Sequence, residues 1–179
     1  MAVTTLSGCR ASVSILATAT KSLAGQDQPI TSPLNRSPAQ TLSLGSGLNQ
    51  VNEPISYIQS VGIGSTLNLD LTTLTDILQV TNINLTIIKA ILIELLSPTQ
   101  DGSGTLASSI SIGAAAANPW STGPFGATDT QKIFNGGLYY ATNFSAAGFP
   151  VDATHKVLKI VNNDAGLAAS VRITILGST

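Results

Sequence analysis

A single histidine, His155, lies three residues after Asp152, and this pair is the first candidate for acid–base chemistry in the chain. A Ser-His-Asp hydrolase uses such a pair together with a nucleophilic hydroxyl. The sequence has no nucleophile-elbow motif, and triads assemble from distant segments, so closeness in sequence is weak evidence for one. We therefore expect His155 to be a surface histidine near a strand end, and we expect no enzyme activity.

Nine acidic residues would have to supply the paired carboxylates of a glycoside hydrolase. Asp70 and Glu94 fall inside expected strands, and if buried there they need partners such as Lys89 or Arg172. Most of the others lie in turn sequences, where Asp accepts hydrogen bonds from the backbone. Both groups are therefore expected to have structural roles. The turn acids are Asp101, Asp129, Asp152 and Asp164.

Cysteine and glycine patterns predict no metal site and no cofactor. The single cysteine, Cys9, excludes an intramolecular disulfide and a cysteine-based zinc site. Gly62-Ile63-Gly64 lacks the third glycine, the helix and the acidic residue of a dinucleotide fingerprint, and it predicts a turn or β-bulge. The sequence DGSG at 101–104 lacks the repeated acids of a calcium loop and predicts a hairpin tip.

Six of the eight aromatic residues lie between positions 120 and 144. Such rings could stack on sugars or nucleobases, but base binding also needs positive charge, and only Lys132 is near. Packing in the core or at a subunit interface is the favoured interpretation, and sugar binding is the alternative. The candidate interface residues are Trp120, Phe125, Tyr139 and Tyr140.

The elements that position these side chains belong to a chain with little charge. Only 9% of its 179 residues are charged, against about 25% in ordinary soluble domains. The net charge of −1 leaves no basic surface for nucleic acid or for an anionic membrane. Hydroxyls from 20 Ser and 21 Thr make up the polar surface instead. Because a net charge near zero favours association, the composition indicates an assembly component.

The residue types favour strands over helices. Thr, Ser, Val and Ile are abundant and Glu occurs only twice, so we predict an all-β fold. Short strands separated by Gly, Pro and Asn turns are typical of an antiparallel β-sandwich or a jelly-roll-like domain. The expected strands are 55–61, 66–71, 85–96, 106–112, 137–142, 155–162 and 168–176.

Two of these segments have distinct patterns. Residues 168–176 alternate, with Val171, Ile173 and Ile175 on one face, which predicts a half-buried strand. Residues 85–96 are apolar on both faces, which fits either a strand between two covered faces or a short helix; β-branched Ile favours the strand. Residues 72–79 could form one helical turn capped by Thr75.

The N-terminal third has a different composition from the rest. Residues 1–20 could form one or two strands, whereas residues 21–54 scatter four prolines among polar residues with few apolar anchors. Such a stretch predicts an extended arm or linker that depends on contacts made elsewhere. We therefore divide the chain into an N-terminal region, 1–54, and a β-sandwich domain, 55–179.

Two segments resemble membrane-targeting or membrane-spanning sequences, but neither meets the requirements for one. The sequence LSGC at 6–9 resembles a lipoprotein cleavage box, but residues 1–5 supply neither a positive region nor an apolar stretch. The most apolar segment, residues 80–96, contains polar and charged residues and is shorter than the ~20 residues of a spanning helix. We expect no membrane partner.

Several short segments of the C-terminal two thirds follow one another in a set order over about 110 residues: LNLDL (67–71), LTD (74–76), IIKAILIEL (87–95), a GSG turn (102–104), SISIGAAAANPW (109–120), NGG (135–137), AAGFPVDATHKVLKIVNNDAG (146–166) and SVRITILG (170–177). In this ordered set the chain resembles a group of small structural proteins of tailed phages and prophages. The Pro-rich N-terminal region has no counterpart in that pattern.

This resemblance implies a β-sandwich virion protein on the capsid surface or in the head–tail region, with no catalytic residue. The expected function is capsid decoration (cementing) or a minor head role, and the expected partners are the major capsid protein, other virion proteins and further copies of the chain; a trimer is one plausible oligomer. A carbohydrate- or receptor-binding module of a tail or fibre is the alternative. The positions that carry over are Lys89, Gly136, Gly137, Gly148 and Lys159.

Overall fold

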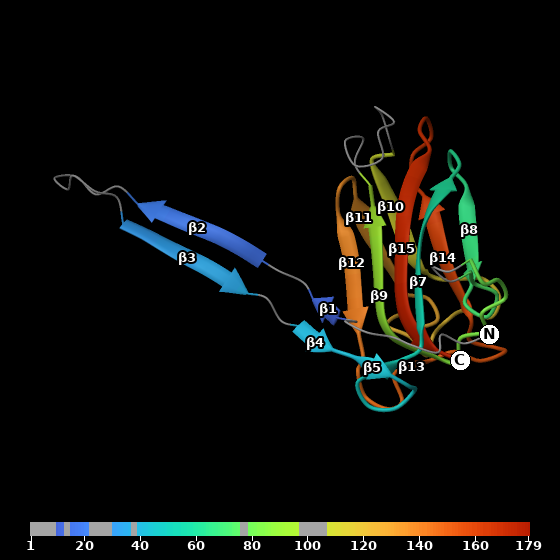
Figure 1. The fold of residues 1–179 in the computed structure, drawn as a ribbon. Helices are drawn as coiled ribbons and strands as arrows, with labels where there is room; N and C mark the ends of the chain where they lie inside the picture. The colour runs from blue at the N-terminus through green and yellow to red at the C-terminus, as the bar shows by residue number, and fades with distance from the viewer. Residues whose placement is uncertain (1–9, 13–14, 22–29, 37–38, 76–78, 97–106) are drawn as a thin grey trace.

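The computed structural model describes residues 10–12, 15–21, 30–36, 39–75, 79–96 and 107–179. These residues form strands and loops, with no helix among them. The two larger sheets are antiparallel throughout and lie one behind the other in Figure 1. The prediction of an all-β fold with antiparallel sheets is confirmed.

The first large sheet has five strands in the order β12-β9-β15-β7, with β13 beside β9. Its central strand, β15, pairs with β7 on one side and β9 on the other, although more than 70 residues separate it from either in sequence. The bounds are Glu53–Val61 (β7), Ile87–Leu95 (β9), Leu138–Thr142 (β12), Phe149–Pro150 (β13) and Ala169–Ser178 (β15).

The second large sheet has four strands in the order β11-β10-β14-β8. Of these, β11 falls outside the segments expected to be strands, because a single residue of TQKIF, Ile133, is buried. The bounds are Thr66–Asp70 (β8), Ser109–Ala114 (β10), Thr130–Phe134 (β11) and Val157–Asn162 (β14).

The facing sides of the two sheets share one hydrophobic core. Val171, Ile173 and Ile175 of β15 are fully buried in it, as the alternating pattern predicted. Alternate residues of the opposite sheet, among them Ile112 and Ile160, complete the cluster. The period of two in these strands therefore places one face of each in the core and leaves the other face to solvent or to other segments.

Strand β9 is apolar on both faces because both faces are covered. Ile91 and Ile93 lie in the main core, whereas Ala90 packs in a second cluster with Leu42 and Val51 on the other side of the sheet. The predicted strand with two covered faces is confirmed, and residues from the N-terminal region supply the second cover.

The other N-terminal strands pair among themselves. Strand β1 (Arg10–Ser12) pairs with β4 (Ala39–Thr41), and β2 (Ile15–Lys21) pairs with β3 (Ile30–Arg36) as a ribbon. Two-residue strands β5 (Ser43–Leu44) and β6 (Gln50–Val51) form a small parallel pair. None of these described strands is hydrogen-bonded into either of the two large sheets (Figure 1).

Two sequence predictions for local structure can be checked. The helical turn expected at 72–79 is wrong for its described residues, because Thr72 and Thr73 form a turn and Leu74 bridges Ile83 instead; residues 76–78 lie outside the described part. Gly62 and Gly64 form the turn between β7 and β8, as expected. The predicted hairpin tip at 101–104 and Cys9 also lie outside the described residues.

Gly148 and Gly64 allow a matched test of how tightly the loop between β12 and β13 packs against β9. Both have φ of +56°, but a Cβ at Gly64 would meet nothing within 4 Å, whereas at Gly148 it would lie 2.3 Å from Ile87 Cγ2 and 2.9 Å from the Ile88 carbonyl oxygen. Gly64→Ala should cost about 1–2 kcal/mol of unfolding free energy from backbone strain alone. Gly148→Ala should cost clearly more in urea titration, and equal losses would contradict this account.

Candidate functional site

Trp120 is the first of the predicted interface residues, and it lies inside the molecule. Its ring is 2% exposed, its Nε1–H donates to the Pro150 carbonyl at 2.8 Å, and it meets the edge of Phe149 at a centroid distance of 6.0 Å. A buried indole needs such an acceptor, and a backbone carbonyl leaves no signal in the sequence. In this position Trp120 offers no face for a sugar to stack on.

The other three predicted interface residues divide between the two sides of the first sheet. Phe125 is buried and stacks on Tyr139 at a centroid distance of 5.0 Å. Tyr140 points to the opposite side, where it packs beside the cluster of Leu42 and Val51. The structure therefore brings Phe125 and Tyr139 together and separates them from Tyr140. Burial raises the pKa of both tyrosines, so their hydroxyls remain neutral at physiological pH.

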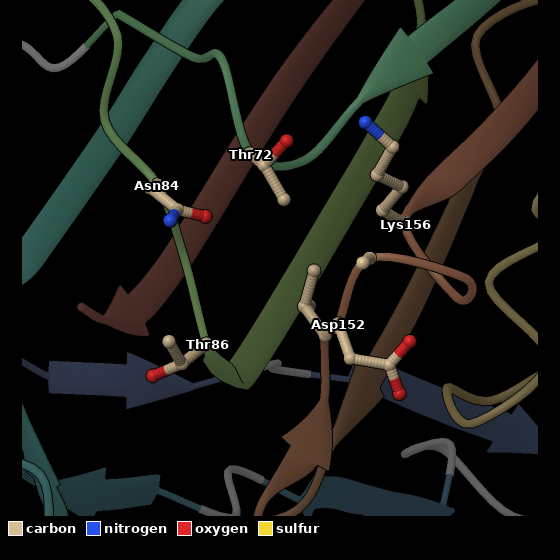
Figure 2. A pocket seen from close by; sticks show the side chains of 7 residues that line it. Thr72, Asn84, Thr86, Asp152 and Lys156 are labelled. Carbon is tan, nitrogen blue, oxygen red and sulfur yellow. The ribbon is translucent and has the colours of Figure 1, made fainter.

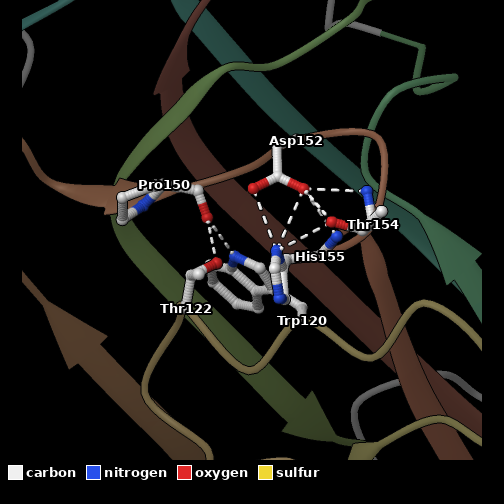
Figure 3. A network of polar contacts seen from close by, with 6 residues as sticks. All are labelled: Trp120, Thr122, Pro150, Asp152, Thr154 and His155. Atoms are coloured by element: carbon white, nitrogen blue, oxygen red, sulfur yellow. Dashed lines mark hydrogen bonds and ion pairs between the residues drawn. The ribbon is translucent and has the colours of Figure 1, made fainter.

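The loop after β13 holds the His155–Asp152 pair, within hydrogen-bonding reach (Figure 3). The Nδ1 atom of His155 lies 2.9 Å from Asp152 Oδ2 and 3.1 Å from Thr154 Oγ1. The backbone N–H and hydroxyl of Thr154 both donate to Asp152 Oδ1, at 2.8 and 2.9 Å. The His155 ring hydrogen bond, followed by those from Thr154, holds the pKa of Asp152 well below its ordinary value.

This arrangement differs from a catalytic triad in one decisive respect. A triad places the carboxylate on one ring nitrogen and the nucleophile on the other, so that the ring can relay a proton. Here Asp152 and Thr154 share the same nitrogen of His155. The group is therefore a closed polar turn, and its geometry supports the expectation that His155 is structural.

The same turn chemistry occurs at Asp70 and corrects its expected partner. Thr72 donates its N–H and its hydroxyl to Asp70 Oδ1, at 2.9 and 2.6 Å, as Thr154 does to Asp152. The cation at Asp70 is Lys156, at 2.7 Å, and neither Lys89 nor Arg172. Burial raises the pKa of Asp70, but the hydrogen bonds from Lys156 and Thr72 outweigh it and leave the pKa lowered.

The Asp-x-Thr spacing was the available signal for both turns, since Asp side chains hydrogen-bond the backbone two residues ahead. Lys156 could not be assigned in this way because it lies 86 residues from Asp70. The second expected pair is present, with Arg172 3.5 Å from Glu94 on the outer side of the first sheet. Both of its side chains are partly exposed, so the pair contributes little stability.

A cavity of about 480 Å³ opens beside these turns (Figure 2). Figure 2 shows the Asp152 carboxylate and the Lys156 ammonium pointing away from each other. Each is already engaged, Asp152 in its own turn and Lys156 with Asp70. The remaining polar groups are hydroxyls and an amide, which suit binding of a neutral polar surface more than acid–base catalysis. The lining residues are Thr72, Asn84, Thr86, Val151, Asp152, Ala153 and Lys156.

Lys89, in the segment IIKAILIEL, is fully buried beside an irregularity in β9. Its ammonium donates to the backbone carbonyls of Ser145 and Ala146, the second at 2.8 Å. Burial lowers the pKa of Lys89. The side chain therefore serves as an internal cap for the loop between β12 and β13.

Among the described residues, no group of three His, Cys, Asp or Glu side chains could hold a metal ion. The described part likewise contains no helix with the length and apolar character needed to span a membrane. Comparison with known proteins gives no family model, no characterised protein and no solved structure that matches the chain.

Asp152→Asn should make the fold less sensitive to acid. Because the folded pKa of Asp152 lies below its unfolded value of about 3.9, ionised Asp152 stabilises the fold above about pH 4, and this contribution is lost as the pH falls toward the folded pKa. Melting temperatures measured from pH 7 to pH 2 should fall less steeply below pH 4 in the variant. Thr154→Val should give an intermediate slope, and an unchanged slope in Asp152→Asn would contradict the role assigned to this turn.

Lys89→Met should destabilise the fold while keeping most of the packing of the side-chain stem. Losing the ammonium leaves two carbonyls without their donor, which costs about 1–3 kcal/mol. Lys132→Met, on exposed strand β11, is the control and should stay within about 0.5 kcal/mol of the native protein. Equal unfolding free energies for the two variants in urea would refute the capping role of Lys89.

Proposed function

We propose that this chain is a structural protein of a virus particle, a decoration (cementing) or minor head protein that binds the assembled shell and stabilises it. In this proposal it is not an enzyme and uses no cofactor. The proposal is supported by what the structure shows of the residues on which the sequence resemblance to phage structural proteins rests. Lys89 caps a loop, Gly148 fits against β9, and a Cβ at Gly137 would lie 2.8 Å from the Phe134 carbonyl oxygen. They shape loops and perform no chemistry.

The proposed architecture is a β-sandwich or jelly-roll-like body with a separate arm. Residues 1–38, called the arm from here on, precede the segment in which Leu42 and Val51 pack on the first sheet. The body displays its loops on the particle, and the arm reaches neighbouring protein. The boundary at residue 38 is drawn so that the arm contains none of the residues that cover Ala90.

The partners in this proposal are the major capsid protein, other virion proteins and further copies of the chain, and the location is the capsid surface or the head–tail region. A homo-oligomer is expected, and a trimer is plausible because capsid lattices offer threefold sites. A protein that binds only the assembled lattice stabilises it by mass action. Its hydroxyl-rich surface with 9% charged residues keeps the desolvation cost of such contacts low.

The proposal is tested with shells assembled from the major capsid protein of the virus that encodes the chain. The full-length chain should co-sediment with these shells and raise their disassembly temperature. A variant lacking residues 1–38, which keeps Leu42 and Val51, should still unfold cooperatively on heating but bind at least about tenfold more weakly, the factor that follows from losing about 1.4 kcal/mol of contact. Absence of co-sedimentation by the full-length chain would refute decoration, and unchanged binding by the variant would refute the role of the arm.

A further inference from the structure

Strand β7 is an edge strand that begins with Glu53 and Pro54, and its remaining segment, Ile55 to Val61, lacks the usual protection against further pairing. In the described structure it has one neighbour, β15, and the register between them runs from Glu53 to Val61 without a shift. Natural edge strands are blocked by charges, prolines or bulges. From Ile55 to Val61 β7 carries no charge, no proline and no bulge, and Ile58 is 53% exposed at its middle.

The other described edges of the two sheets are better protected or shorter. Strand β11 has Lys132 at its centre, and β8 ends at Asp70 with its ion pair to Lys156. Strand β12 has five residues, against seven in the unprotected segment of β7 from Ile55 to Val61. Among these edges, β7 is therefore the longest and the one best suited to accept another strand.

A cleft of about 400 Å³ lies between β7 and β8, the neighbouring edge strands of the two sheets. Buried Leu69 and Leu74 contribute its apolar lining, and Tyr57 borders it from β7, where burial raises the pKa of the hydroxyl to about 12. Gln59 and Asn68 add polar groups. A strand paired with β7 would direct alternate side chains toward this cleft, so an alternating apolar and polar strand fits it.

Net charge favours the N-terminal residues of a second copy of this chain as the occupant. The residues before β7 carry three basic side chains and one acidic one, whereas the residues from Glu53 onward carry five basic and eight acidic ones, so the two parts have opposite net charge. Within the arm, β2 and β3 pair only with each other, and an isolated two-stranded ribbon is marginally stable in water. In Figure 1 this ribbon lies on the β12 side of the sheet, away from β7 of its own chain.

We propose that the edge of β7, together with the cleft beside β8, is an acceptor site for an arm strand from a second copy of this chain. Main-chain hydrogen bonds supply the affinity, and the cleft selects the alternating side chains. Exchange of arms links copies on the shell without any change inside either body. The inference rests on the proposed function only in giving the arm an intermolecular role.

The test uses the full-length chain in solution, without capsid. Sedimentation velocity over a range of concentrations should show self-association that weakens with added salt, since opposite charges are involved. Ile58→Lys places the natural blocking charge in β7 and should raise the Kd by about tenfold or more. Ile63→Lys is the matched control, because Ile63 is equally exposed, at 55%, in the adjacent turn, and it should leave the Kd within about twofold.

A second measurement locates the contact. A copy labelled with a nitroxide at Cys9, the single cysteine of the arm, is mixed with an isotopically labelled Cys9→Ser copy, so that only intermolecular contacts broaden resonances. Broadening should fall on amides of β7 and on Leu69 and Leu74, and Ile58→Lys should reduce it in step with the higher Kd. Broadening confined to other strands, a monomeric native chain, or equal effects of the two lysine variants would overturn the inference. Shell binding without arm exchange would refute this inference alone, and arm exchange without shell binding would refute the proposed function alone.

Discussion

The buried ammonium of Lys89 is the interaction on which one whole end of the molecule depends. It holds the carbonyls of Ser145 and Ala146, and so fixes the loop that brings β13 beside β9. The last residue of β13, Pro150, then offers its carbonyl to Trp120. The ammonium of Lys89 thus fixes the loop between β12 and β13. Through that loop it positions the carbonyl that binds the buried Trp120 side chain and the start of the turn that holds Asp152. Such a cation is costly to bury, and its cost is offset only because both acceptors are fixed by the same fold.

Most of the strands could be predicted from the sequence, because buried residues recur at every second position of a strand. Val171, Ile173 and Ile175 alternate and are fully buried, and β9 is apolar on both faces because a second layer covers Ala90. Strand β11 was not predicted, because its one buried residue, Ile133, gives no alternation of apolar and polar residues. Its position is decided by pairing with β10, which is a property of the assembled sheet.

The candidate site was harder to predict than the strands, for physical reasons visible in its members. Asp152 was correctly assigned to a turn, because its hydrogen bonds to Thr154 are local. The partner of Asp70 was assigned wrongly, because Lys156 approaches it only after β8 and β14 pair. Trp120 could have lain on the surface or in the core, and the acceptor that decides the matter is a main-chain oxygen, which every residue type carries.

The central position of β15 affects how the first sheet can form while the chain is being synthesised. Strands β7 and β9 are synthesised long before β15, yet in the finished sheet they are joined only through it. During synthesis both present unsatisfied backbone groups, and β7 keeps one free edge even afterwards. Contacts this distant in sequence form slowly, so the nascent chain passes through a long interval in which apolar strands await their neighbour. With only 9% charged residues, the chain has little electrostatic repulsion to keep such nascent chains apart, so the unpaired apolar strands favour aggregation until β15 pairs with them.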